Sequence, residues 1–346
     1  MMTALKPIAL TMGEPAGIGP DITIGAWIRR NSLDVPPFLV IGDNGILEAR
    51  ARALDVDIAI ARVSDPATVV KVWEAALPVM ALDAQAPITA GRPAPASASL
   101  VIASIEHAVG LVLKATASAM VTNPIHKQTL YNAGFAYPGH TEFLAALACK
   151  AGYTARPVMM VTAPGLKVVP ITIHMPLRDV AKKLRTQDII AQTRIVARDL
   201  AHFFALTQPR IAMTGLNPHA GEGGSLGHEE RDVIKPALEQ LRHDGLDVAG
   251  PFPADTLFHE QARSAYDVCI CMYHDQALIP VKMLGFHDGV NCTLGLPFVR
   301  TSPDHGTALT LAGRGRADPS SLIAALKQAR NMAASAQGDN MSGVAP

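Results

Sequence analysis

The sequence predicts an α/β protein of two domains, with open, mostly parallel sheets covered by helices on both faces. The chain has 346 residues, more than a single hydrophobic core usually serves. Hydrophobic residues make up 49% of it and charged residues 17%, which is typical of a well-buried globular protein and excludes a disordered one. Short apolar runs alternate with helical patterns along most of the chain, as strands and crossover helices do in α/β proteins.

Each element is predicted from its length and periodicity. Short apolar runs are predicted as strands, and longer runs with a helical pattern as helices. In chain order, the predictions are a strand at 6–13, a helix at 19–30, a strand at 38–43, a helix at 44–54, a helix at 99–119, a strand at 119–124, paired strands at 158–165 and 167–174, a helix at 186–206, a strand at 209–219, a helix at 229–245 and a strand at 267–275.

Charge and cysteine content exclude several kinds of partner. Lys plus Arg equals Asp plus Glu, at 30 each, so the chain lacks the basic excess of a nucleic-acid-binding surface. No apolar run approaches the roughly 18 residues of a membrane span, and no signal peptide is recognised at the N-terminus, so no membrane partner is expected. The four cysteines are too few and too scattered for a disulfide framework, which indicates a reducing cytoplasm. They are Cys149, Cys269, Cys271 and Cys292.

Two segments combine glycine with the start of a predicted helix. Residues 11–21, TMGEPAGIGPD, follow a strand but lack the spacing of the dinucleotide fingerprint, so a tight turn is a better interpretation than close approach to a ligand. Residues 138–145, PGHTEFLA, offer backbone amides, the Thr141 hydroxyl and the His140 imidazole to an anion such as phosphate. The alternative is that Thr141 is a helix N-cap, with Glu142 in the first turn.

Three histidines each close a predicted strand: His174, His219 and His274. Histidines at corresponding strand ends indicate a metal site with open coordination positions. The alternative is three unrelated polar residues, because no local motif such as H-E-x-x-H supports a site. Asp275 follows His274 and is a candidate to orient its ring or to lie beside the metal.

The segment 274–319 is the densest in functional residue types. Lys282 and Arg300 lie in apolar sequence among many glycines and prolines, so we interpret them as paired inward charges or as a clamp for an anion. The glycine-rich loop 215–227 precedes a helix and is either a mobile lid or a structural turn.

Several of these motifs together resemble the 4-hydroxythreonine-4-phosphate dehydrogenase family of pyridoxal phosphate biosynthesis. The resemblance runs from about residue 6 to residue 330 and rests on TMGEPAGIGPD, TNPIHK, GHTEFL, IHMPLRD, GLNPHAGEGG, ADTLF, MYHDQ and NCTLGLPFVRTSPDHGTALTLAGRG. The last motif is also similar to the loop that holds the adenosine half of NAD in isocitrate- and isopropylmalate-dehydrogenase-like enzymes.

The resemblance implies a fold, a reaction and site residues. It implies an isocitrate-dehydrogenase-like fold, with the active-site cleft between a discontinuous NAD-binding domain, 1–128 with 280–335, and a substrate, metal and dimerisation domain, 129–279. The tail 336–346, which lacks periodicity, is expected to be disordered. The resemblance also implies the use of NAD or NADP. It implies one divalent ion, Zn²⁺, Mg²⁺ or Co²⁺, held by His174, His219 and His274. It implies substrate contacts from His140, Thr141, Lys282, Asn291 and Arg300, and cofactor contacts from Asp304, His305 and Gly306.

The implied reaction is oxidation of the C3 hydroxyl of 4-phosphooxy-L-threonine, followed by loss of CO₂ to give 3-amino-2-oxopropyl phosphate. The proton acceptor stays open among Asp255, Asp275, Lys282 and metal-bound water. A homodimer is implied whose metal site is shared, with His174 and His219 from one subunit and His274 from the other. Alternatives are a relative that oxidises a phosphorylated threonate or erythronate, and a three-histidine metal hydrolase.

Overall fold

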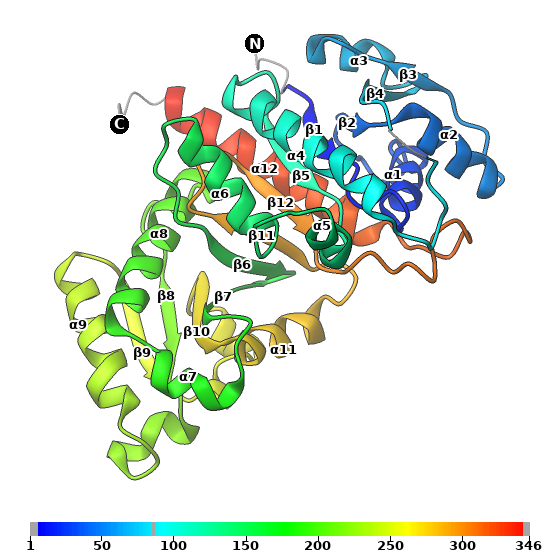
Figure 1. The fold of residues 1–346 in the computed structure, drawn as a ribbon. Helices are drawn as coiled ribbons and strands as arrows, with labels where there is room; N and C mark the ends of the chain where they lie inside the picture. The colour runs from blue at the N-terminus through cyan, green and yellow to red at the C-terminus, as the bar shows by residue number, and fades with distance from the viewer. Residues whose placement is uncertain (1–5, 85–86, 342–346) are drawn as a thin grey trace. The chain divides into compact units, whose positions relative to one another are not determined.

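The computed structural model describes residues 6–84 and 87–341 of the chain. It is an α/β protein whose contacts form two compact units. The first unit takes the chain up to Pro157 together with Leu296–Ala334, and the second takes Val158–Gly295 with the residues from Ser335 onward. Strands and helices alternate in both units (Figure 1), and most strand pairs are parallel, so the predicted fold class is confirmed.

The sheet of the first unit is parallel throughout, in the order β3-β4-β2-β1-β5-β12. Ile8 of β1 lies beside Phe38 of β2 and Ala119 of β5. β1 and β2 are buried along their whole length, as continuous apolar runs are when helices cover both faces of a parallel sheet. The strands are β1 (Ile8–Thr11), β2 (Phe38–Gly42), β3 (Ile60–Arg62), β4 (Leu77–Ala81), β5 (Ala119–Thr122) and β12 (Arg300–Pro303).

Helices follow these strands along the chain, and the start of one is fixed by a side chain. The Asp43 carboxylate accepts a hydrogen bond from the Ile46 N–H at 3.0 Å and caps α2. The helices, with short 3₁₀ segments named η, are α1 (Gly19–Ile28), α2 (Asn44–Ala53), η1 (Pro66–Thr68), α3 (Val69–Val72), η2 (Pro95–Ser97), α4 (Ala98–Leu113), α5 (Lys127–Asn132), α6 (His140–Lys150) and α12 (Ser320–Met341).

The sheet of the second unit has the order β11-β6-β7-β10-β8-β9. β6 is antiparallel to both β11 and β7, which confirms the predicted strand pair, and the other neighbours are parallel. The strands are β6 (Val158–Ala163), β7 (Leu166–Thr172), β8 (Ile211–Thr214), β9 (Val248–Phe252), β10 (Val268–Tyr273) and β11 (Val290–Leu294).

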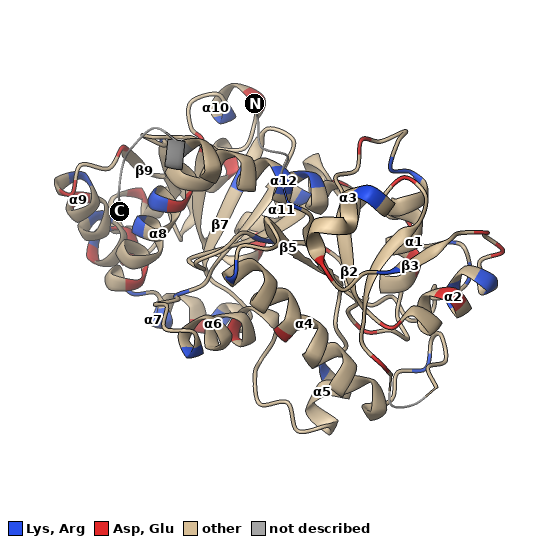
Figure 2. Ribbon diagram, turned by 90° about the horizontal axis from the view of Figure 1, so that it is seen from above, with Lys and Arg blue, Asp and Glu red and all other residues tan. Residues whose placement is uncertain are grey.

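Helices α8 and α11 cover the central strands of this sheet: α8 contacts β6, β7 and β11, and α11 contacts β6, β7 and β10. Both basic and acidic residues lie on helices α8 and α9 (Figure 2). The helical segments are α7 (Leu177–Lys183), α8 (Thr186–Phe204), η3 (Pro218–Gly224), the π-helical η4 (Glu230–Ile234), α9 (Lys235–His243), η5 (Ala254–Thr256), α10 (Glu260–Arg263) and α11 (His274–Leu284).

The expectation that no apolar run reaches the length of a membrane span is wrong. The segment Pro95–Leu113 has 19 residues and is long and apolar enough by composition. In the structure, α4 packs on β1, β2 and β5, and Ile105 and Val109 join the core around Met120. A core helix passes the same test as a membrane helix, so this length and composition follow from the burial of α4 between the sheet and α6.

Two expected boundaries differ from the structure. The chain changes unit after Pro157 and after Gly295, whereas the sequence analysis expects breaks after residue 128 and before residue 280. The first difference arises because α6 packs on α4, and Phe143 and Leu144 belong to the core of the first unit. The expected disordered tail is also corrected in part: α12 continues to Met341, and residues 342–346 lie outside the described part of the chain.

Candidate functional site

A cationic group lies at the carboxyl end of β5 in the first unit. Arg300, the first residue of β12, is 3% exposed, and its Nη2 donates a hydrogen bond to Thr122 Oγ1 at 2.6 Å. Thr122 is the last residue of β5, and the carboxyl ends of parallel strands are where α/β sheets bind ligands. His140 lies within electrostatic range of Arg300, so two of the predicted substrate residues are close together.

His140 is the first residue of α6, and its Nε2 is buried with no hydrogen-bond partner among the described residues. Burial, and then the positive charges of Arg300 and Lys127, hold the pKa of His140 well below its usual range. The imidazole is therefore neutral at neutral pH, with Nε2 available to a bound group. The N-cap of α6 is Gly139, which offers no side chain, so the alternative of Thr141 as N-cap is wrong.

Two predicted metal ligands lie side by side in the second unit. His174 follows β7 and His274 follows the neighbouring strand β10, and their ring centroids are 5.8 Å apart. Nδ1 of His274 is 2.7 Å from Oδ1 of Asp275, which leaves Nε2 of His274 for a ligand. A pocket of about 210 Å³ is lined by residues that include His174, His274 and Asp275.

His219 lies on the loop that follows β8, the other neighbour of β10. Within residues 6–84 and 87–341, no group of three or more His, Cys, Asp or Glu side chains is arranged to hold a metal ion. The structure thus brings His174 and His274 together in one chain and does not add His219 to them. The family resemblance implies that His174 and His274 come from different subunits, whereas in the structure their rings are 5.8 Å apart within one chain.

The loop of His219 is a strained turn held by a buried carboxylate. His219 and the four residues after it all have positive φ, and His219 has φ 54°. Oε1 of Glu230 accepts the N–H groups of Leu216 and Asn217, both at 2.7 Å, and Glu230 is 3% exposed. His174 also has a positive φ, 26°. Non-glycine residues rarely adopt this region, and they gather at functional sites when they do.

The remaining predicted substrate and catalytic residues are in the second unit. Lys282 lies on α11, with its Nζ 5.6 Å from the Phe286 ring centroid, and Asn291 lies on β11 opposite Val161 of β6. Asp255 is exposed in η5. His140, Thr141 and Arg300 therefore belong to one unit, and Lys282 and Asn291 to the other.

The predicted cofactor residues follow β12 in the first unit. The Asp304 N–H donates to Ser321 Oγ at 3.2 Å, and the Nε2 of His305 is buried with no hydrogen-bond partner in the described part of the chain. Gly306 is exposed, and a methyl group added to it would meet nothing within 4 Å. This segment offers both a buried polar atom and open space to a ligand.

The glycine-rich segment 11–21 is a tight turn, as the sequence predicts. Gly13 has φ +68°, and a methyl group there would lie 2.5 Å from the Pro124 carbonyl oxygen. A methyl group on Gly17 would lie 2.8 Å from the Thr307 carbonyl oxygen, which also accepts the Ile18 N–H at 3.0 Å. The turn thus packs directly against the segment that follows β12.

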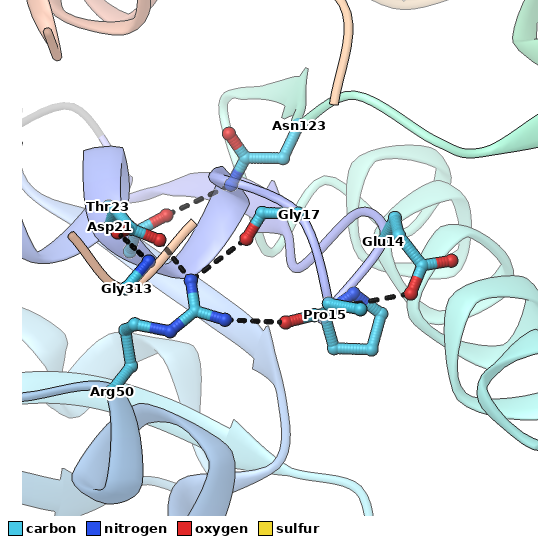
Figure 3. A network of polar contacts seen from close by, with 9 residues as sticks. Glu14, Pro15, Gly17, Asp21, Thr23, Arg50, Asn123 and Gly313 are labelled. Carbon is cyan, nitrogen blue, oxygen red and sulfur yellow. Dashed lines mark hydrogen bonds and ion pairs between the residues drawn. The ribbon is translucent and has the colours of Figure 1, made fainter. Parts of the chain in front are cut away.

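A buried ion pair missed by the sequence analysis holds this turn (Figure 3). Arg50 of α2 pairs with Asp21 of α1, and their side chains are 4% and 3% exposed. Arg50 also donates to the carbonyl oxygens of Gly17 at 2.8 Å and Pro15 at 3.0 Å, while Asp21 accepts the Gly313 N–H at 2.7 Å. Arg50 is one of two arginines in EARARAL and only its burial distinguishes it, so no sequence signal marks it.

Comparisons with known proteins cover nearly the whole chain. Residues 34–329 match the family described as Pyridoxal phosphate biosynthetic protein PdxA. A 4-hydroxythreonine-4-phosphate dehydrogenase from Bradyrhizobium diazoefficiens is 55% identical, over 96% of this chain and 98% of its own. The crystal structure of the Klebsiella pneumoniae enzyme of that name has a TM-score of 0.85 at 36% identity, covering 95% of this chain and 99% of that chain.

A terephthalate 1,2-cis-dihydrodiol dehydrogenase from Burkholderia xenovorans has a TM-score of 0.64 at 26% identity, covering 94% of this chain and 98% of that chain. The fold and these matches define the class of protein: an α/β oxidoreductase that acts on a CH–OH group. The chain belongs to the PdxA family of pyridoxal phosphate biosynthetic proteins.

Proposed function

We propose that the chain catalyses the metal-dependent, NAD(P)-linked oxidation of 4-phosphooxy-L-threonine in the cytoplasm. A bound nicotinamide would accept the C3 hydride and a base would take the hydroxyl proton, giving 2-amino-3-oxo-4-(phosphooxy)butanoate. This β-keto acid loses CO₂ to give 3-amino-2-oxopropyl phosphate, a step in vitamin B6 biosynthesis. The supporting observation is the buried Arg300 guanidinium near the neutral His140 imidazole, in a chain that is 55% identical to a relative named for this reaction.

We assign recognition of the anionic substrate to the five side chains that the family resemblance implies. Arg300 is buried and charged, and His140 and Thr141 begin α6, whose first amides have no side-chain cap. Free amides at a helix start, together with a guanidinium, bind phosphate well. Lys282 and Asn291 remain the proposed contacts from the second unit.

The donor set fits one divalent metal ion. Imidazoles accept Zn²⁺ and Co²⁺ readily and Mg²⁺ less so, and two of the three proposed ligands already lie 5.8 Å apart between ring centroids. Asp275 holds Nδ1 of His274, so it orients the ring as carboxylates behind metal-binding histidines do. When bound, a divalent ion lowers the pKa of a hydroxyl and polarises a carbonyl group.

The general base stays open among Asp255, Asp275, Lys282 and metal-bound water. Asp275 already contacts His274, which favours an orienting role for it. We propose a homodimer with a shared metal site, in which His174 and His219 come from one subunit and His274 from the other; the alternative is that His174 and His274 serve one site from the same chain.

NAD or NADP is assigned to the segment that begins with Asp304, His305 and Gly306. Among the described residues, Nε2 of His305 has no hydrogen-bond partner and there is open space beside Gly306, and both features fit a ligand at this position. The exposed side chains of Arg314 and Arg316 are candidates to bind the 2′-phosphate of NADP.

Replacing Gly306 with valine should raise the KM for the nicotinamide cofactor by about tenfold, because the added group fills space assigned to that ligand. The melting temperature should stay unchanged, since no atom of the described residues lies within 4 Å of the new Cβ. Gly13→Val is the matched control: it clashes with the Pro124 carbonyl oxygen and should lower stability. A cofactor KM raised only by the Gly13 change would refute the assignment.

A substrate panel tests the function as a whole. Purified enzyme is assayed by NADH absorbance with 4-phosphooxy-L-threonine, phosphorylated threonate, phosphorylated erythronate and a cis-dihydrodiol, using NAD and NADP, with and without chelator. We expect turnover of the phosphorylated hydroxythreonine only, lost with chelator and restored by added Zn²⁺ or Co²⁺. Preferred turnover of a sugar acid, full activity after metal removal, or hydrolysis without cofactor would each overturn the proposal.

A further inference from the structure

We propose that Lys127, the first residue of α5, is a further substrate-binding residue that contacts the phosphate group with Arg300 and His140. The inference rests on the proposed function and extends it by one residue. The TNPIHK segment that contains Lys127 connects β5 to α5, so it begins at Thr122, the residue bound by Arg300.

The position of the Lys127 side chain supports this assignment. A methyl group built on Gly139 would lie 3.6 Å from Lys127 Nζ and 3.5 Å from its Cε, so the ammonium lies beside the N-cap of α6. Lys127 is exposed and makes no hydrogen bond or ion pair within the described residues. Glu142 Oε2 approaches the same methyl position to 3.5 Å without forming an ion pair with the lysine. The ammonium is thus available to an incoming ligand.

The electrostatics of this location are unfavourable without an anion. An ammonium beside the N-terminus of α6 lies at the positive end of that helix dipole. It is also close enough to His140 to lower the pKa of that imidazole, as Arg300 does. A bound dianion would relieve the repulsion among these groups. Positive charges that gather around uncapped helix amides are typical of a phosphate site.

We assign the phosphate group to this site because it carries nearly two negative charges at neutral pH, while the carboxylate carries one. The cations Lys127 and Arg300, together with the first backbone amides of α6, match the larger charge of the phosphate group. The contribution of Lys127 to substrate binding should therefore depend on the phosphate group. It should vanish with a substrate that has no phosphate.

The experiment compares Lys127→Met, Lys127→Arg and Lys150→Met with wild type. Lys150 is an exposed lysine at the other end of α6, so its change matches the loss of charge at a distance from the site. For Lys127→Met, we expect a KM for 4-phosphooxy-L-threonine higher by about 10–100-fold, from loss of one charge-assisted contact. We expect kcat to change less than about threefold, since the contact exists before and during the reaction. Lys127→Arg should recover most of the KM, and Lys150→Met should match wild type.

A second measurement does not depend on turnover. The dissociation constant of inorganic phosphate, measured by calorimetry in the absence of substrate, should rise in Lys127→Met by a factor similar to the KM. Unphosphorylated 4-hydroxythreonine, used as a poor substrate or inhibitor, should bind both proteins equally.

The two failures can be told apart. Wild type that binds phosphate but does not oxidise the substrate would overturn the proposed function and leave the phosphate assignment intact. The role of Lys127 would be overturned if Lys127→Met kept the wild-type KM and phosphate affinity. It would also be overturned if the variant bound the unphosphorylated compound more weakly by the same factor as the phosphorylated substrate. An equal loss in Lys150→Met would assign the effect to net charge and would also overturn it.

Discussion

Replacing Arg50 with methionine should lower the free energy of unfolding of the first unit by about 3–5 kcal/mol, because it leaves the buried Asp21 carboxylate without its cation. The change also removes the hydrogen bonds to the Gly17 and Pro15 carbonyl oxygens. Both tryptophans of the chain, Trp27 and Trp73, are buried in this unit. Tryptophan fluorescence during urea unfolding therefore reports on the unit that contains the ion pair.

The free energy of unfolding that Arg50→Met loses should depend on pH. Burial raises the pKa of Asp21 even in the presence of Arg50, and removal of Arg50 raises it further. A carboxyl group whose pKa is higher in the folded than in the unfolded state stabilises the fold at low pH, and this contribution disappears as pH rises through the folded pKa. Arg50→Met should therefore be closest to wild type below about pH 4 and most destabilised at neutral and alkaline pH.

A double-mutant cycle provides the control. Asp21→Asn alone leaves a buried guanidinium and should also destabilise the unit, while the combination with Arg50→Met removes both charges. The double variant should lose less free energy than the sum of the two single variants. Strict additivity at neutral pH would show that the two side chains do not act as a pair.

His174→Ala and His274→Ala should each lower kcat/KM by about a thousandfold or more, because a divalent ion contributes several kcal/mol of stabilisation to such a reaction. Each variant should also lose bound metal, measured by elemental analysis of the dialysed protein. His243→Ala is the matched control, since His243 is exposed on α9 of the same unit. Full metal content with full activity in either variant would refute the assignment.

Mixed reassembly of the two inactive variants tests how the ligands are divided. If His174 and His274 serve one site from the same chain, as their 5.8 Å separation favours, every site in a mixed dimer stays damaged. If they come from opposite subunits, as the family resemblance implies, one site in each mixed dimer is intact. Recovery of roughly a quarter of wild-type activity would then follow from random pairing.

The predictable part of the fold is the part with strong local patterns. β1, β2 and β5 are continuous apolar runs, and α8 has a regular apolar side, so periodicity is sufficient to predict them. β4 and β9 are missed: each has only five residues, one of them a proline, Pro78 or Pro251, and both lie toward the outside of their sheets, whereas Pro170 lies within the longer apolar run of β7. α12 is missed as a whole: no helix is predicted after residue 275, and its last turns lie in a tail whose sequence has no periodicity.

In the candidate site, too, only features with a local sequence pattern can be predicted. Histidines at strand ends can be recognised from the sequence, but β7, β10 and β8 are neighbours only through pairing between distant segments. Which histidines meet therefore depends on strand order, which local patterns do not encode. Arg50, Glu230 and Lys127 are missed for a related reason: their roles depend on burial and on contacts with residues from other elements.

The discontinuous first unit also constrains the order in which the chain can fold during synthesis. β12 pairs with β5, and the Gly313 N–H donates to Asp21, a residue 292 positions earlier. The second unit is nearly continuous, from Val158 to Gly295, and leaves the ribosome before β12 does. Because domains generally fold as units, the second unit can complete its sheet while the first still lacks an edge strand and the partner of its buried carboxylate. The N-terminal half of this protein is therefore expected to be the last part to become native.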